Sequence, residues 1–389
     1  MPVALVQLRR SLLATLRTAG PHTGAAVYDL TAASPLFALR GTIGRPPASV
    51  EKLYTTVALL TKLPQSTRLH TIVLGTGHLG PGGIWHGSLY LHGGGDPTFG
   101  DGTFNRIWEH GYGPTATQLA HQLSARGIRE VTGAVIADES LFDSRRGGPA
   151  TAFAPDIPDF GGQLTALAFD HGATAAGLTP PTFAAKQLAV TMQAAGIKAV
   201  ASKVTAPTPR HARKLAVVSS PPLPVLIDLM NVPSDDLFAE LLTKQLGVRF
   251  AHKGTIAAGA HVISSTLAEG YGLHPRIVDG SGLSRSDRSS PTEVVTLLRT
   301  VWRTPIGHVL SGSLPVVGVN GTTWRIGKGT AAQGQCIAKT GTLNYVTNLA
   351  GYCRARSGHV LTFAFLLDGP SNEQSIALLT RLVAALAKY

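Results

Sequence analysis

Apolar and charged residues alternate at helical spacing over the first part of the chain. Leucines and valines recur there with arginines between them, so we expect an amphipathic helix at 1–20. Two short apolar stretches separated by a turn follow, and they predict strands at 25–30 and 36–39. A second helix is expected to begin after Pro46 and Pro47 and to run to a turn near residue 63.

The middle of the chain changes in composition, because glycine becomes frequent from about residue 69 onward. Short β-like stretches alternate there with turns, and helical spacing returns later, each helix leading through a Gly-Ile pair into a strand-like stretch. The expected elements are strands at 71–74 and 88–91, a helix at 116–126, a strand at 130–137, a helix at 183–195 and a strand at 198–204. Helix followed by strand, twice, predicts small α/β units, and the prolines of 207–213 predict a linker.

The last third predicts a helix after a turn at 233–236, a tight loop at 279–285 and a helix at 291–302. Ser234 or Asp235 is the expected cap of the first of these helices. Further strands and a last helix complete the pattern. They are a strand pair at 336–343 and 347–353, a strand at 360–367, and a helix that begins with the capping box of Ser371 and Gln374.

The two cysteines of the chain lie on that strand pair. If Asn344 and Tyr345 form the centre of the hairpin, Cys336 faces Cys353 across the ladder, at a separation that a disulfide can span. A disulfide would indicate an oxidising compartment. Two buried free thiols are the alternative, and the sequence leaves both open.

Composition narrows the class of protein. With 389 residues, 44% hydrophobic and 14% charged, the chain can bury a substantial core and form two or three globular domains. The formal net charge of +12 favours anionic partners, but no nucleic-acid motif accompanies it, so we expect no nucleic-acid binding. Two cysteines and no His-x-x-x-His motif joined to a glutamate argue against a metal site.

The chain contains no apolar stretch of transmembrane length, and its first residues do not read as a secretory signal. The same pattern is expected of an exported protein whose signal has been removed. The sequence pattern alone therefore leaves the compartment open.

Candidate chemistry begins with Ser49 and Lys52, three residues apart at the expected start of the second helix. This spacing places both side chains on one helix face, where Lys52 can remove the proton of the Ser49 hydroxyl if its amine is neutral. The free N–H groups of a helix start favour an oxyanion. Ser-x-x-Lys alone is weak, since it is common by chance.

Two further motifs strengthen this interpretation: Ser234-Asp235-Asp236 at the start of a helix, and Lys339-Thr340-Gly341-Thr342 on a strand. Lys339 offers an ammonium to a substrate carboxylate, with hydroxyls from Thr340 and Thr342, while Gly341 allows a substrate backbone to approach. The backbone N–H groups of Ser49 and Thr342 are the expected oxyanion hole, and Ser234 can pass a proton to a leaving amine. His92-Gly93-Gly94-Gly95 resembles the oxyanion loop of lipases. That interpretation is excluded, because the chain has no Gly-x-Ser-x-Gly motif.

In order and setting, the three motifs resemble those of the D-alanyl-D-alanine carboxypeptidase/endopeptidase family, the class C low-molecular-mass penicillin-binding proteins. The gap of 181 residues between Lys52 and Ser234 also resembles this family and exceeds that of class A β-lactamases. β-Lactam hydrolysis is a weaker reading, because no deacylating glutamate is evident. The resemblance is carried by Pro47 to Leu53, Leu89 to Thr98, Pro233 to Glu240, Asp279 to Arg285 and Lys339 to Tyr352.

The resemblance implies an α/β (α+β) fold: a transpeptidase/β-lactamase-like domain with an antiparallel sheet and flanking helices, built from 1–68 and 214–389 and interrupted by inserted smaller α/β domains at 69–213. It also implies a cofactor-free serine DD-peptidase that removes the terminal D-alanine, or cleaves cross-links, of peptidoglycan stem peptides through an acyl-enzyme at Ser49. Such enzymes bind β-lactams covalently and work outside the cytoplasmic membrane.

Asp236 departs from the family pattern, which has asparagine at this position. A carboxylate cannot donate a hydrogen bond to a substrate carbonyl, and close to Lys52 and Lys339 it favours their charged forms. We therefore expect slow acylation. The alternative is an impaired homologue that serves as a peptidoglycan-binding or scaffold protein.

Overall fold

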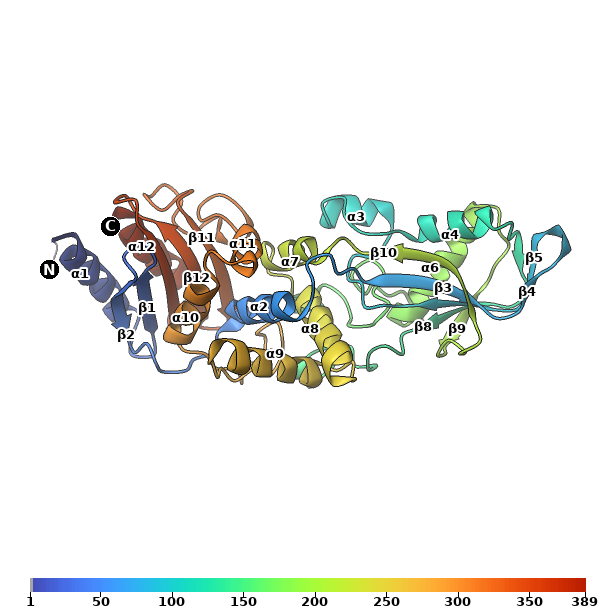
Figure 1. Cartoon of the computed structure of the whole chain (residues 1–389), viewed down its shortest axis with the longest axis horizontal. Helices are drawn as coiled ribbons and strands as arrows, with labels where there is room; N and C mark the ends of the chain where they lie inside the picture. Colours follow the sequence, from blue (N-terminus) through green and yellow to red (C-terminus); the bar gives the residue numbers. More distant parts are fainter. Residues whose placement is uncertain (1–2) are drawn as a thin grey trace. The chain divides into compact units, whose positions relative to one another are not determined.

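The computed structural model describes residues 3–389 and divides into two compact units (Figure 1). Met1 and Pro2, with which the expected first helix begins, lie outside the described residues. The first unit comprises the chain through Pro64, Pro224–Ala239 and Gly259–Tyr389; the second comprises Gln65–Leu223 and Glu240–Ala258. Both ends of the chain thus contribute to one unit, and a long insertion forms most of the other.

The first unit is built on a five-stranded antiparallel sheet with the order β11-β12-β13-β1-β2. Its strands are β1 (Gly24–Asp29), β2 (Ser34–Leu39), β11 (Cys336–Leu343), β12 (Val346–Arg354) and β13 (Val360–Asp368). The central strand, β13, is buried from Leu361 through Leu367. Such a continuous apolar strand requires cover on both of its faces.

Helices provide that cover. Those assigned at least in part to this unit are α1 (Val3–Thr18), α2 (Lys52–Lys62), α7 (Leu223–Asn231), α8 (Asp236–Ala251), α9 (Ile256–Tyr271), α10 (Pro291–Val301), α11 (Pro305–Gly312) and α12 (Asn372–Lys388). Helices α1 and α12 pack together (Figure 1). Leu12, Leu382, Phe363 and Phe365 share one buried cluster. Helix α10 packs against β13 and β1. Alternate residues of β13 therefore contact different helices.

The second unit has a five-stranded mixed sheet of order β10-β3-β6-β8-β9 and a small sheet of order β4-β5-β7. Helices α4 and α6 pack on each other and on strands of the larger sheet. The elements are β3 (His70–Gly75), β4 (His78–Leu79), β5 (Ile84–His86), β6 (Leu89–His92), α3 (Gly102–Trp108), α4 (Ala116–Ala125), β7 (Glu130–Val131), β8 (Val135–Asp138), α5 (Ile157–Phe160), α6 (Pro180–Ala194), β9 (Ala201–Thr205) and β10 (Arg213–Ser219).

The unit boundaries differ from the expected domain boundaries. The prediction assigned residues from 214 onward to the first domain, whereas β10 forms an antiparallel ladder with β3 of the second unit. Residues 240–258 also belong to the second unit. Apolar alternation identifies a strand but does not specify its partner, which explains the difference at β10.

The predicted hairpin is confirmed residue by residue. Strands β11 and β12 pair with Cys336 opposite Cys353 and Leu343 opposite Val346, and Tyr345 at the turn has a φ of 60°. The two cysteines form a disulfide, so of the two alternatives the free thiols are excluded. The capping box of Ser371 and Gln374 is also confirmed at the start of α12.

We predict that replacing both cysteines, Cys336→Ala with Cys353→Ala, lowers the free energy of unfolding by about 2–4 kcal/mol, because the bridge restricts the unfolded chain. The bridge spans a sequence separation of 17. Chemical denaturation of the oxidised wild type and the variant measures this difference. Thiol labelling of the denatured wild type is the control, and equal stability of the two proteins would contradict the prediction.

Candidate active site

Ser49 lies on a short 3₁₀ helix, η1 (Ala48–Glu51), which leads directly into α2. The preceding residue, Ala48, has a φ of 48°, a left-handed conformation that is uncommon for alanine and typical of functional turns. Lys52 is the first residue of α2, and its Nζ donates a hydrogen bond of 3.1 Å to Ser49 Oγ. The structure thus brings together the predicted nucleophile and base.

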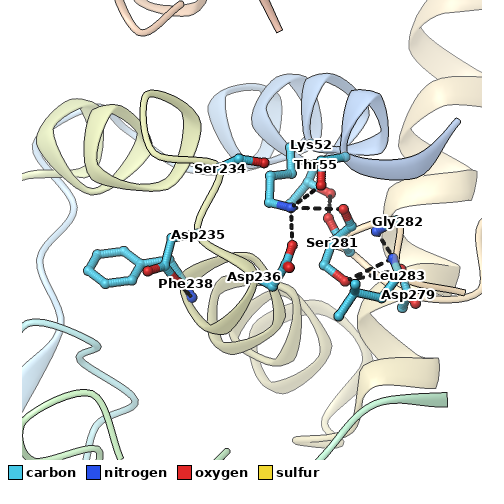
Figure 2. A network of polar contacts seen from close by, with 12 residues as sticks. Lys52, Thr55, Ser234, Asp235, Asp236, Phe238, Asp279, Ser281, Gly282 and Leu283 are labelled. Atoms are coloured by element: carbon cyan, nitrogen blue, oxygen red, sulfur yellow. Dashed lines mark hydrogen bonds and ion pairs between the residues drawn. The ribbon is translucent and has the colours of Figure 1, made fainter. Parts of the chain in front are cut away.

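Lys52 is fully buried and has three hydrogen-bond acceptors around its Nζ (Figure 2). Besides Ser49 Oγ, it donates to the carbonyl oxygen of Ser281 at 2.9 Å and forms an ion pair with Asp236. An ammonium group has three hydrogens to donate, and these contacts use all of them. In this arrangement Lys52 is a charged donor, so it must lose a proton before it can serve as a base.

Asp236 is the first residue of α8, and its side chain is 13% exposed. Burial raises the pKa of its carboxyl group to about 6, although the charges of Lys52 and Lys339 oppose this shift. The nearby charge of Asp235 raises the pKa further. The carboxyl group of Asp236 therefore changes its charge at about pH 6, next to the group that has to act as a base.

Ser234 and Lys339 form a second pair in the site. Lys339, on β11, is fully buried, and its Nζ donates to Ser234 Oγ at 2.7 Å and to its neighbour's carbonyl, Thr340 O, at 3.0 Å. Burial, and then repulsion from Lys52, hold the pKa of Lys339 well below its usual value. Of the two expected caps, Asp235 is the one that accepts the N–H of Phe238, at 2.8 Å. Ser234 has a φ of 68°, and its hydroxyl group contacts Lys339 instead of capping the helix.

Gly341 lies against the turn that carries Ser49. A β-carbon at this position would lie 2.5 Å from the carbonyl oxygen of Pro47 and 3.1 Å from the backbone nitrogen of Ser49. The absence of a side chain therefore allows β11 to approach the turn that carries the nucleophile. The expected approach of a substrate backbone at Gly341 stays a prediction.

Asn348, which the sequence analysis did not single out, also holds this turn. It lies opposite Gly341 on β12, and its Nδ2 donates to the carbonyl oxygens of Pro46 and Pro47 at 2.9 and 2.8 Å. Its Oδ1 accepts the N–H of Leu367 on the next strand, at 3.0 Å. A lone amide in a largely apolar strand, buried from Val346 to Cys353, is the signal that could have identified it.

The loop at 279–285 supplies the third acceptor of Lys52. Asp279 is buried and accepts the N–H groups of Gly282 at 2.7 Å and Ser284 at 2.8 Å, which fixes the loop (Figure 2). Gly282 has a φ of 86°, and a β-carbon there would lie 1.9 Å from Ala48 O. The sequence predicted a tight loop here, but not that its carbonyl at Ser281 contacts the base.

The remaining predicted residues lie on the same strand as Lys339. Thr340 is largely buried, and its Oγ1 donates to Thr322 Oγ1 at 2.6 Å, while Thr342 is exposed and pairs with Thr347. Thr322 lies on the 3₁₀ helix η4 (Gly321–Thr323) and was not predicted. The hydroxyl of Thr340 thus already has one partner.

Comparison with known proteins agrees with this geometry. A model of the D-Ala-D-Ala carboxypeptidase 3 (S13) family matches residues 9–182 and 159–389. The chain belongs to this family. It is therefore a serine-type D-Ala-D-Ala carboxypeptidase, and the family resemblance inferred from the motifs is confirmed.

Two relatives and one solved structure illustrate the family. The chain is 27% identical to a D-alanyl-D-alanine carboxypeptidase of Actinomadura over 99% of this chain and 85% of the relative. It is 29% identical to Carboxypeptidase DacB of Mycolicibacterium smegmatis, covering 94% and 78% of the two chains. Penicillin-binding protein 4 of Haemophilus influenzae matches with a TM-score of 0.82 at 20% identity, over 97% and 99% of the chains.

This structural match confirms the predicted mixed α/β fold. The same Haemophilus protein has also been solved in complex with a β-lactam, and that structure matches with a TM-score of 0.77 at 19% identity. Among residues 3–389, no helix combines the length and apolar character needed to cross a membrane.

We predict that Gly341→Ala lowers kcat/KM for release of D-alanine at least about tenfold, because small displacements of a nucleophile are costly to catalysis. The added methyl group would push against the Ser49 turn. Gly270→Ala is the matched control, since Gly270 lies on α9 with open space where its β-carbon would be. Equal kcat/KM for the two variants, with both folded by circular dichroism, would refute the role given to Gly341.

Proposed function

We propose that the chain cleaves the terminal D-Ala-D-Ala bond, or the cross-links, of peptidoglycan stem peptides through an acyl-enzyme at Ser49. The observation that carries this proposal is the 3.1 Å hydrogen bond between Lys52 Nζ and Ser49 Oγ in a fully buried setting. A serine hydroxyl becomes a nucleophile only when a neighbouring base removes its proton. Ser234 also accepts a hydrogen bond from a buried lysine, Lys339, but Ser49 is the serine of the Ser-x-x-Lys motif at the start of a helix.

Acylation first requires a neutral Lys52. We propose that Lys52 gives up a proton to solvent, against its ion pair with Asp236, which leaves a neutral amine. The carboxylate of Asp236 opposes this loss, and it does so less at low pH, because its pKa is raised to about 6 and the acid is then neutral. Ser49 Oγ then attacks the substrate carbonyl carbon while its proton moves to Lys52 Nζ. In its protonated form, Asp236 can donate a hydrogen bond to the substrate, as an asparagine would.

The same geometry accounts for the later steps. The backbone N–H groups of Ser49 and Thr342 would stabilise the oxyanion. When the C–N bond breaks, the leaving amine takes a proton through Ser234, whose Oγ accepts a hydrogen bond from Lys339 Nζ at 2.7 Å. Water then hydrolyses the ester and regenerates Ser49. Lys339, with Thr340 and Thr342, would hold the carboxylate at the substrate C-terminus.

We extend the proposal to β-lactams and to the compartment. The similar fold of a Haemophilus protein that binds a β-lactam supports covalent capture of these compounds at Ser49. A disulfide between Cys336 and Cys353 suits an oxidising compartment, which supports a location outside the cytoplasmic membrane. No metal or cofactor enters the proposed reaction.

Mass spectrometry of the intact protein after incubation with benzylpenicillin tests the acyl-enzyme. We predict a covalent adduct on the wild type and none on Ser49→Ala, because the hydroxyl is the attacking group. Thr61→Ala is the control, as its hydroxyl lies on the same helix and donates to a helix carbonyl at 2.7 Å. A wild type that is folded and remains unlabelled, or an adduct that persists on Ser49→Ala, would sink the proposal.

A second candidate function is favoured by the ion pair between Lys52 and Asp236. If the proton stays on Lys52, the site binds stem peptides through Lys339 and the strand β11 but turns them over slowly. The chain would then act mainly as a peptidoglycan-binding protein. Peptide binding without D-alanine release distinguishes this candidate from the first.

We predict that Asp236→Asn accelerates acylation by benzylpenicillin, with an effect that grows as pH rises. Asp236 has a pKa of about 6, so its carboxylate predominates above that pH, where it favours the ammonium form of Lys52 and repels the substrate carbonyl. Below it the acid is neutral, like asparagine. The ratio of variant to wild-type rates is therefore expected to be near one at pH 5 and at least about tenfold by pH 8.

Labelling rates at several pH values provide this ratio. Asp235→Asn is the matched control, because it removes a neighbouring carboxylate that caps α8 through the N–H of Phe238 and should only lower the pKa of Asp236. A ratio that does not change with pH would show that the charge of Asp236 has no part in acylation.

A further inference from the structure

A pocket of about 440 Å³ lies in the first unit, and most of the charged side chains that line it are positive. Four arginines and one histidine line it together with a single carboxylate: Arg40, Arg45, Arg285, Arg288, His22 and Asp368. These residues come from the segments on either side of β1 and β2, from the loop before α10 and from the end of β13. The proposed reaction uses none of them.

The arginines of this pocket are held by backbone carbonyls and not by carboxylates. Arg45 is 5% exposed, and its guanidinium donates to the carbonyl oxygens of Ile43 at 2.6 Å and Thr23 at 3.0 Å. Arg40 also donates to Thr23 O, at 3.0 Å, and Arg288 to its neighbour's carbonyl, Asp287 O, at 2.7 Å. These contacts orient the guanidinium groups, and within the described chain the one carboxylate of the pocket, Asp368, forms no ion pair with them.

The charges act on one another. Burial lowers the pKa of Arg45, the charge of Arg40 lowers it further, and Asp368 opposes the shift. Throughout the part of the chain that the structure describes, none of the four arginines forms an ion pair with a carboxylate. Like charges gathered around a pocket cost free energy, and an anion placed among them would recover it.

Arginine in particular indicates the class of anion. Its planar guanidinium presents paired N–H donors that match phosphate and carboxylate oxygens, and it remains charged even where burial lowers its pKa. Three of the four are exposed and one is buried, so a small anionic group could enter the pocket and contact both kinds. A pocket of this size suits one phosphate group with its substituents better than a stretched nucleic acid strand.

We propose that this arginine pocket binds a phosphate group of an anionic cell-wall polymer and so holds the enzyme on its insoluble substrate. Binding of phosphate does not depend on the proposed function. The inference that the phosphate belongs to a cell-wall polymer rests on the proposed function. The net charge of +12 would then attract anionic polymers over the whole surface, and the arginine pocket would bind them at one defined site.

The test compares two variants with the same change in charge. Arg40→Gln with Arg288→Gln removes two exposed guanidinium groups of the pocket; Arg10→Gln with Arg381→Gln removes two exposed ones from α1 and α12. Calorimetry with inorganic phosphate measures binding. Sedimentation with cell walls is then measured before and after hydrofluoric acid has removed their phosphodiester polymers, and D-alanine release is followed in parallel.

We expect the pocket variant to lose affinity for inorganic phosphate at least about tenfold, since charge-assisted bonds are lost, while the control variant keeps it. Wild type should sediment with untreated walls more than with treated walls. No phosphate binding by wild type, or equal binding by the two variants, would overturn the site.

Phosphate binding without preference for untreated walls, or tighter binding of a single-stranded oligonucleotide than of the walls, would overturn the polymer as the ligand. D-alanine release separates this inference from the proposed function. If neither wild type nor either variant releases D-alanine while wild type still binds phosphate, the proposed peptidase activity fails and the phosphate site stands.

Discussion

The buried ammonium group of Lys52 is the constraint on which the arrangement of the first unit depends. A charge without exposure to water is tolerated only if each of its hydrogens finds an acceptor. The three acceptors come from η1, from the start of α8 and from the loop at 279–285, segments far apart in the sequence. Folding of this unit and assembly of its active site are therefore one process, because misplacing any of the three segments leaves a charge unpaired.

Two buried lysines, Lys52 and Lys339, also lie close enough in the site for their charges to interact. Lys52 and Lys339 repel each other, which contributes to the lowered pKa of Lys339, and Asp236 offsets only part of that repulsion. A substrate with a free C-terminal carboxylate would add a negative charge near these two lysines. Their mutual repulsion would then favour binding of an anionic peptide end.

The sequence predicted those features that depend on neighbouring residues, such as turns, helix caps and the register of a hairpin. The register of β11 and β12 followed from turn residues, and the start of α12 from its capping box. The partner of β10, the helices α9 and α11, and the function of Asn348 were not predicted. A strand's partner and a buried amide's acceptors depend on segments distant in the sequence, and periodicity carries no information about them. The Asp236 substitution was evident from sequence, but its raised pKa required knowledge of its burial.

The disulfide lies at one end of the strand that carries Lys339 at its middle, and it fixes more than stability. Side chains on a strand alternate between faces, so a slip of one residue along β12 would turn Lys339 and Gly341 away from the Ser49 turn and bring threonines toward it. A covalent bond between opposed residues forbids that slip. Cys336 and Cys353 thereby fix the register that points Lys339 and Gly341 toward the turn that carries Ser49.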